Sequence, residues 1–349
     1  MEKYDVVVLG AGITGLIASY YATDEGFKTA LIAPEIPSIV STKKSVGIIT
    51  RQLYTKKEIN LAGETIKILF EVLPNIYRVM YSRDFITIEE EKTAFQDFRF
   101  YRKTIHDVDI YYYGETPDKF DVINLAVGEA ILHTKQDVML DTEATMNNIY
   151  SVVKNRTGLT EYRLKAEKLE RTGSTEYTVY LENGEALGAK NVILAMGSWN
   201  KYFLENNRIY LPVATYACIA VRFEVDGEIP ISGSDEVNYM YWMVEEDTVV
   251  AGEYYQSVPI IRPDRLDLVE LENKDKTVRR ALMDRFKSVK DLRLKEYIVG
   301  PCSVPLGKRP LFKEVMNNVF LIDGMAGYGF TLGPALAKEA ISLVSQRMG

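Results

Sequence analysis

The chain has 349 residues, of which 47% are hydrophobic and 26% are charged. This balance is typical of a compact globular protein and excludes a disordered or fibrous one. The formal net charge of −7 and a pI near 5.2 provide no basic surface for a nucleic-acid backbone or an anionic membrane. We therefore expect a globular protein whose partners are small molecules and not nucleic acids.

Other features of the sequence narrow the chemistry. No apolar run approaches the ~20 residues of a membrane span, so we expect a cytoplasmic protein. Cys218 and Cys302 are the only cysteines and the chain has two histidines, too few for a zinc cluster or a disulfide framework. We interpret each cysteine as a small buried hydrophobic residue and expect no metal site. Redox chemistry would then need an organic cofactor.

Apolar periodicity and turn residues predict the elements of the chain in order. Residues 4–33 have the pattern of strand, tight turn, helix and strand, a βαβ unit of the usual length. The middle is mixed, and the chain closes on a strand, a glycine-rich turn and a helix. The predicted strands are 4–9, 29–33, 86–96 with connecting residues, 111–113, 177–181, 191–195, 218–223, 249–252 and 318–324, and the predicted helices are 16–22, 58–80, 276–287 and 334–344.

The turn between the first strand and helix has three glycines in a dinucleotide-binding pattern. Gly10 permits the tight turn, Gly12 lets the backbone approach a pyrophosphate, and Gly15 lets the helix pack closely on the strand. The helix N-terminus, with Ile13 and Thr14, offers free N–H groups and a partial positive charge to the phosphates. The pattern and its position between strand and helix predict a dinucleotide cofactor.

A carboxylate about 20 residues beyond the glycines usually binds the adenosine ribose. By spacing this position falls on Ala33, and the nearest carboxylate is Glu35, which follows Pro34. We predict that Glu35 reaches the ribose; otherwise backbone groups and water take this role. Nicotinamide-dependent dehydrogenases use the same fingerprint, so it does not identify the cofactor by itself.

Several segments together resemble the D-amino-acid oxidase-like flavoprotein family, especially its glycine oxidase and sarcosine oxidase branch. They occur in the family's order and span nearly the whole chain: 5–15, 45–49, 192–199, 211–213 and 324–334. Their dispersal, and the absence of a second dinucleotide motif from the sequence, disfavour a nicotinamide-dependent dehydrogenase. The resemblance implies an FAD-dependent oxidoreductase that oxidises the C–N bond of a small amine or amino acid by hydride transfer to flavin N5.

The resemblance also implies an α/β fold in which a Rossmann-like FAD-binding domain is interleaved with a mixed-sheet α+β substrate domain. We place the FAD-binding domain in residues 1–80, 130–205 and 300–349, and the substrate domain in residues 81–129 and 206–299. The chain would then pass several times between the two domains.

The resemblance assigns cofactor contacts to four of the five dispersed segments. The residues before the last helix would direct N–H groups at the pyrimidine edge of the flavin, where negative charge accumulates on reduction. The implied cofactor-binding residues are Gly10, Gly12, Ile13, Thr14, Gly15, Glu35, Ser45, Gly47, Ala195, Gly197, Trp199, Gly327, Gly329, Phe330, Thr331 and Leu332.

The chain departs from the family pattern where glycine-oxidase-like members hold a substrate carboxylate with two arginines. These positions fall on Cys302 and Gly327. Either the substrate lacks a carboxylate there, or another cation replaces the arginines, with Arg51, Lys308 and Arg309 as the nearby candidates.

The candidate catalytic residues are Arg51, Tyr241 and Tyr328. Tyr241 or its neighbour Trp242 aligns with a pocket-lining tyrosine of the family, and an aromatic wall there suits an apolar or cationic amine. Residues 249–252 contain no lysine, which the sarcosine oxidase branch has there to assist the reaction with oxygen. We therefore favour a dehydrogenase, and the acceptor is left open among oxygen, a quinone and a partner protein.

Two alternatives stay open at this stage. The sarcosine oxidase branch links its flavin through a cysteine in the segment that contains Cys302, so a covalent bond is a hypothesis here as well. The loss of both carboxylate arginines also suits a non-catalytic or partner-dependent flavin subunit of a multi-subunit dehydrogenase.

Overall fold

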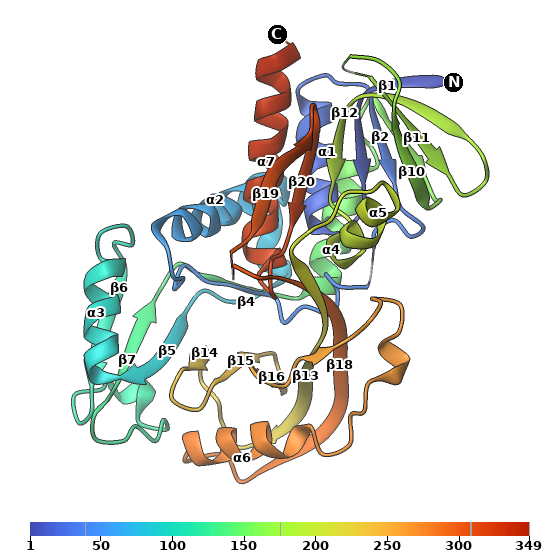
Figure 1. Ribbon diagram of the computed structural model, residues 1–349. Helices are drawn as coiled ribbons and strands as arrows, with labels where there is room; N and C mark the ends of the chain where they lie inside the picture. The colour runs from blue at the N-terminus through green and yellow to red at the C-terminus, as the bar shows by residue number, and fades with distance from the viewer. Residues whose placement is uncertain (39, 175, 308, 349) are drawn as a thin grey trace.

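The computed structural model of the protein describes residues 1–38, 40–174, 176–307 and 309–348. Two large sheets, of eight and nine strands, and a small three-stranded sheet form the framework (Figure 1). Each large sheet collects strands from distant parts of the chain. This arrangement confirms the expected fold class, a Rossmann-like domain interleaved with a mixed-sheet domain.

A parallel core in the order β20-β12-β1-β2-β9 forms the centre of the eight-stranded sheet. Strand β12 borders β1 along one edge, and its other edge pairs with β11 at its beginning and with β20 at its end. The strands are β1 (Glu2–Leu9), β2 (Thr29–Ile32), β9 (Leu159–Tyr162), β10 (Ala166–Arg171), β11 (Tyr177–Leu181), β12 (Ala186–Leu194), β19 (Leu311–Met316) and β20 (Val319–Asp323).

Both faces of this core are buried, which explains the continuous apolar sequences of its strands. Val6 and Val8 of β1 pack on the side of α1, α2, α4 and α7, whereas Val7 and Leu9 face β10, β11 and α5. No described helix is both long and apolar enough to cross a membrane. The helices are α1 (Ile13–Asp24), α2 (Lys56–Val72), α3 (Glu91–Tyr101), α4 (Thr142–Val153), α5 (Asn200–Asn206), α6 (Asp275–Arg285) and α7 (Gly329–Met348).

The nine-stranded sheet has the order β17-β13-β16-β15-β14-β5-β7-β6, and β18 pairs with β13. Its strands β7 and β18 include residues 130–134 and 300–305, which the expected boundaries place in the other domain. Its strands are β5 (Phe85–Glu90), β6 (Val108–Tyr112), β7 (Glu129–Thr134), β13 (Val213–Asp226), β14 (Ser232–Asp235), β15 (Met240–Val244), β16 (Thr248–Glu253), β17 (Val258–Pro259) and β18 (Asp291–Pro305).

The two faces of the nine-stranded sheet differ in what covers them. Trp242 and Val249 face outward and pack with Leu282 and Phe286 at the α6 side. The other face is directed towards the eight-stranded domain (Figure 1). There Phe85 and Met243 pack with residues of the small sheet, whose strands are β3 (Ile48–Ile49), β4 (Met80–Ser82) and β8 (Val138–Leu140). This inner face is therefore in contact with the predicted cofactor segment 45–49.

Several predicted elements have different bounds in the structure, among them one strand and two helices. The predicted strand 86–96 ends at Glu90, and helix α3 follows at once, with Ala94 and Tyr101 buried on one side. The predicted helix 58–80 ends at Val72, because Pro74 disfavours helical conformation in the preceding residue. The last helix begins at Gly329, five residues before the predicted start at Pro334.

Cys218 on β13 and Cys302 on β18 form a disulfide, so the interpretation of two separate buried thiols was wrong. The strands are antiparallel, with Tyr216 opposite Cys302 and Cys218 opposite Gly300, and this register brings the cysteine Cα atoms to 6.0 Å. A sulfur in this bond is not available to a flavin. The structure therefore contradicts a covalent flavin link through Cys302.

We expect reduction of the disulfide to destabilise the protein. The bond joins residues that are 84 positions apart. A cross-link of this kind lowers the conformational entropy of the unfolded chain and thereby raises the free energy of unfolding by about 2–4 kcal/mol. A reductant should lower the melting temperature of the native protein by a few degrees and leave that of a Cys302→Ser variant unchanged. Calorimetry with and without reductant tests this. Two alkylated thiols in the folded, unreduced protein would contradict the bond.

Candidate functional site

The turn from β1 into α1 allows very close contacts between backbone segments. Gly10 has a φ of +104°, and a Cβ atom on it would lie 2.4 Å from the oxygen of Ala195 at the end of β12. A Cβ atom on Gly15 would lie 1.8 Å from the Gly10 oxygen. Both positions therefore require glycine, and helix α1 starts immediately behind the carboxyl ends of the parallel strands.

The N-terminus of α7 meets the N-terminus of α1. A Cβ atom on Gly333 would lie 2.3 Å from the Thr14 hydroxyl oxygen, and the Thr331 hydroxyl donates to the Ile48 carbonyl at 3.1 Å. Gly12, the N-cap of α1, has no side chain to cap the helix, the Ile13 N–H donates to the Thr42 hydroxyl at 3.3 Å, and the first turn contains no acidic residue. The structure thus brings the four predicted cofactor segments, 10–15, 45–47, 195–199 and 327–332, to one place with helix N–H groups suited to an anion.

Asp323, the last residue of β20, is a buried carboxyl at this place, and the nearby Ser303 and Asn200 side chains lower its pKa against the effect of burial. Its side chain is buried, and Oδ1 accepts a hydrogen bond from the Gly324 N–H at 2.7 Å. Asp323 Oδ2 and the Ser303 hydroxyl are buried without a partner among the described residues, and burial raises the pKa of Asp323 to about 6. A ribityl chain carries hydroxyl groups that would satisfy both atoms. The residues present therefore fit an FAD molecule.

Other predicted cofactor residues lie at the rim or in the core. Glu35 is exposed in the loop after β2, and Gly197 is exposed with a φ of +54°. Trp199 is partly buried at the end of a 3₁₀ turn. Phe330 and Leu332 are buried in the core between α7 and the sheet, so their side chains pack while their backbone stays with the N-terminal turn of α7. The individual cofactor contacts remain predictions.

A small cavity of about 40 Å³ adjoins the N-terminal turn of α7. Tyr328 lines it from the α7 side and Tyr54 from the segment before α2. Burial, together with Tyr54 and Glu236, raises the pKa of Tyr328 well above its usual value. The other lining residues are Leu53, Glu58, Pro310, Gly324, Met325, Ala326 and Leu332.

Two more tyrosines extend this aromatic wall over the inner face of the nine-stranded sheet. The rings of Tyr241 and Tyr254 lie 5.9 Å apart, and the Tyr254 hydroxyl donates to Glu236 at 2.8 Å. A Cβ atom on Gly252 would lie 2.5 Å from the Tyr241 hydroxyl, so glycine makes room for this ring. Burial raises the pKa of Tyr241 to about 12. Tyr254 thus connects Tyr241 with the cavity at Tyr328.

The other sequence candidates lie elsewhere. Trp242 points to the outer face, where its indole N–H donates to the Ile231 carbonyl at 2.7 Å, so Tyr241 is the residue of this pair on the inner face. The Arg51 guanidinium binds Asp107 through Nη2 and Asp137 through Nε, each at 3.0 Å. Arg309 is exposed. Lys308 lies outside the described residues.

Sequence reasoning missed the carboxylates near the tyrosines. Glu89 at the end of β5 is only 5% exposed, and its Oε2 has no hydrogen-bond partner among the described residues. Burial, followed by the nearby charges of Asp97 and Glu236, raises the pKa of Glu89 to about 8. A carboxylate at a strand end suggests solvent exposure, but Glu89 continues the alternation Phe85, Thr87 on the inner face. That alternation was the available signal.

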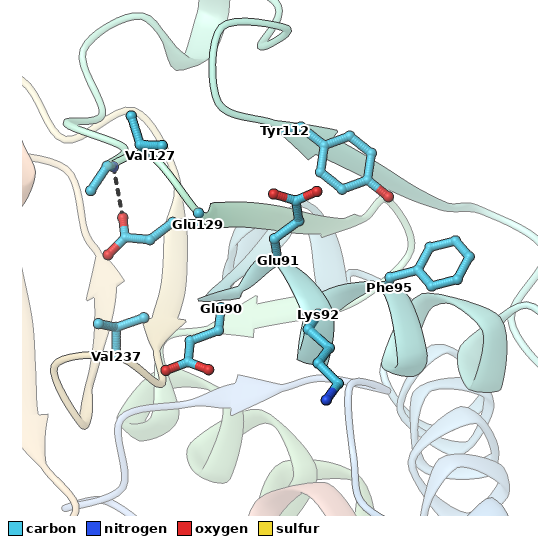
Figure 2. A pocket seen from close by; sticks show the side chains of 10 residues that line it. Glu90, Glu91, Lys92, Phe95, Tyr112, Val127, Glu129 and Val237 are labelled. Atoms are coloured by element: carbon cyan, nitrogen blue, oxygen red, sulfur yellow. Dashed lines mark hydrogen bonds between the residues drawn. The ribbon is translucent and has the colours of Figure 1, made fainter.

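A larger groove of about 710 Å³ lies where β5 runs into α3 (Figure 2). Glu90, Glu91 and Lys92, at the junction of β5 and α3, line it together with Phe95 and Tyr112. It is open and polar, and none of the predicted cofactor or catalytic residues lines it. We therefore place the functional site at the small tyrosine-lined cavity.

Comparisons with known proteins agree with this architecture. The family model described as "DAO: FAD dependent oxidoreductase" matches residues 5–343. A search of curated protein sequences finds no match.

Solved structures with the same fold cover nearly the whole chain. Glycine oxidase from Geobacillus kaustophilus has a TM-score of 0.84 at 14% identity, covering 99% of this chain and 95% of that one. L-Proline dehydrogenase from P. horikoshii has a TM-score of 0.87 at 15% identity (99% and 94%), and L-amino acid deaminase from Proteus vulgaris has 0.81 at 14% (99% and 94%). At such identities the likeness establishes the fold alone.

The raised pKa of Glu89 makes the stability of the substrate-free protein depend on pH. Since the pKa rises from 4.5 to about 8 on folding, the folded state binds the proton more tightly, and stability is lost as pH rises from about 4.5 to 8. Glu89→Gln removes a penalty of roughly 3–5 kcal/mol at pH 8. We expect its melting temperature to exceed that of the native protein by several degrees at pH 8 and to match it near pH 4.

The exposed neighbour Glu90 provides a matched control for this measurement. Glu90→Gln should follow the native melting temperature at every pH. Equal pH profiles for Glu89→Gln and the native protein would show that Glu89 is ionised in the folded state without cost.

Proposed function

The chain belongs to the FAD-dependent oxidoreductase family, and from this premise we propose that it oxidises the C–N bond of a small amine or amino acid. Bound FAD supplies the chemistry, because its flavin accepts a hydride at N5. One observation carries the proposal. Tyr328 lies directly before the α7 turn predicted to contact the flavin, and it lines the tyrosine-walled cavity. A substrate in that cavity would adjoin the cofactor.

The residues at the helix N-termini would hold the cofactor. The N–H groups at Gly12, Ile13 and Thr14 would bind the pyrophosphate, where the dipole of α1 favours negative charge. Asp323 and Ser303 would bind the ribityl hydroxyls with their unpartnered oxygens. These contacts would hold the cofactor at the N-terminal turns of α1 and α7.

The tyrosine wall would orient the substrate and exclude water. Tyr241 and Tyr254 are held rigidly, the first against Gly252 and the second by its hydrogen bond to Glu236. Positioning of this kind accounts for much of the rate in reactions whose electron sink is a cofactor. No acid or base side chain is required by the hydride step itself.

We favour a dehydrogenase over an oxidase for this chain. Strand β16 presents Val250 and Gly252 to the inner face, and Thr248–Glu253 contains no lysine that would assist oxygen. The reduced cofactor would then pass its electrons to another acceptor, such as a quinone or a partner protein. We therefore expect an enzyme whose reduced form reacts slowly with oxygen.

Anaerobic reduction tests the reaction class. The purified protein should show a flavin absorption band, and one amine or amino acid of a panel should bleach it without oxygen. On admission of air the band should return over minutes, and a quinone or dye acceptor should restore it faster. Return within seconds in air would indicate an oxidase. A flavin that no amine or amino acid bleaches would overturn the proposed C–N oxidation.

A glycine variant tests the cofactor site. A Cβ atom on Gly12 would point within 3.0 Å of the Thr42 hydroxyl, into the space left for the pyrophosphate. We expect Gly12→Ala to bind FAD at least tenfold more weakly, which corresponds to about 1.4 kcal/mol, while remaining folded. Gly63→Ala, inside helix α2, is the control, because its Cβ atom would make only an ordinary contact with the Arg51 Cδ atom at 4.0 Å. FAD retained after gel filtration measures both, and equal retention would contradict the assigned site.

A further inference from the structure

The inner face of the nine-stranded sheet carries carboxylates that no described cation neutralises. Glu89 on β5 follows Phe85 and Thr87 in alternation, and Phe85 packs against the cofactor segment at Val46 and Ile48. Thr87 bonds to Ser234 across the parallel pair β5 and β14 at 2.9 Å. Glu89 therefore faces the same side as the cofactor segment.

A second carboxylate lies beside the first. The Glu236 N–H donates to the Ile88 carbonyl at 2.9 Å, which continues the β5–β14 register and places Glu236 next to Glu89. Glu236 also accepts the hydrogen bond of Tyr254, and its charge raises the pKa values of both Tyr254 and Tyr328. This pair therefore adjoins the tyrosine wall of the candidate site.

The pair lacks the compensation that buried carboxylates normally have. Lysine and arginine residues in the described parts of the chain form no ion pair with Glu58, Glu89, Asp97 or Glu236, although they pair with many other carboxylates. Glu89 is more than nine-tenths buried and its Oε2 has no partner in the described structure. Burial keeps the Glu89 carboxyl protonated in the substrate-free protein at neutral pH, and a cation from outside the protein would let it ionise.

An organic cation fits this place better than a metal ion. Within the described residues, no group of three or more His, Cys, Asp or Glu side chains is arranged to hold a metal. The Tyr254 hydroxyl donates to Glu236 at 2.8 Å, and the charge of Glu236 adds to burial in raising the pKa values of Tyr54 and Tyr328. Tyrosine rings near such a carboxylate attract ammonium groups. A combination of carboxylates and tyrosines is suited to an alkylammonium.

The positions that would bind a substrate carboxylate carry no cation. Cys302 and Gly327 take the places of the two family arginines, and the Ala326 N–H donates to the Ser303 carbonyl at 3.0 Å, so these positions lie side by side. Cys302 is joined to Cys218 there. The site therefore offers carboxylates for a cation but no guanidinium at the expected places for an anion.

We propose that the substrate carries two ammonium groups, of which Glu89 and Glu236 bind the distal one while the amine at the other end is oxidised. The substrate class is then an α,ω-diamine or a polyamine and not a simple amino acid. This inference rests on the proposed function, because it names the substrate of that same site.

Matched substrates test the proposal on the FAD-loaded protein. Putrescine should reduce the flavin at an about ten- to hundredfold lower half-saturating concentration than n-butylamine, because only putrescine has the distal ammonium. Glu89→Gln and Glu236→Gln should each raise the value for putrescine about tenfold and so reduce its advantage over n-butylamine. Glu90→Gln, in the outer groove of Figure 2, is the control and should change neither.

A binding measurement separates this inference from the proposed function. The bis-trimethylammonium analogue of putrescine cannot be oxidised, since its nitrogens have no lone pair, and its binding is measured by calorimetry. Two results together would support the cation site and overturn the C–N oxidation. In that case the analogue binds more weakly to Glu89→Gln than to the native protein, and neither putrescine nor any other amine reduces the flavin. Flavin reduction by glycine, sarcosine or n-butylamine as readily as by putrescine, with both variants unaffected, would overturn the diamine.

Discussion

The close approach of backbone segments at the carboxyl end of the parallel core is the constraint on which the site depends. Gly10 contacts Ala195, Gly15 contacts Gly10, and Gly333 contacts Thr14 at distances that exclude a side chain. These contacts let α1 and α7 start at the same point and direct both N-termini into one space. Two helix dipoles thereby favour negative charge there, which suits both the pyrophosphate and a flavin that becomes negative on reduction.

The nine-stranded sheet completes the site because successive residues of its strands point to opposite faces, which separates the apolar core residues from those that face the site. Every second residue of β5, β15 and β16 packs outward in the apolar core under α6, which fixes the register of the strands. The intervening residues, such as Thr87, Glu89 and Tyr241, must then face the cofactor domain. The free-energy cost of burying Glu89 would unfold a smaller domain. It is tolerable here because the apolar core on the outer face of the sheet stabilises the same strands. The unpaired Glu89 is held in place by that core.

The sequence allowed prediction of the features that depend on local rules. The glycine turn, the βαβ unit and the final strand and helix follow from residue types at short spacing, and the dispersed family-like segments predicted the interleaved fold. Features that depend on distant partners were missed. The bond between Cys218 and Cys302 follows from the register of β13 and β18, and Arg51 is bound by Asp107 and Asp137, which lie far from it in sequence. Helix α3 was missed because the apolar pattern of β5 runs directly into it.

The charge at the site is the feature that neither local pattern nor fold determines. The resemblance implies two arginines that meet a substrate carboxylate, and their positions fall on the disulfide-bonded Cys302 and on Gly327. Loss of the arginines alone would leave the site neutral and unspecific. Glu89 and Glu236 instead stand on the facing sheet without a counter-ion among the described side chains, and a bound cation would let the buried Glu89 carboxyl ionise. Because a like charge near buried carboxylates costs several kcal/mol, a carboxylate substrate is disfavoured by repulsion as well as by the missing arginines.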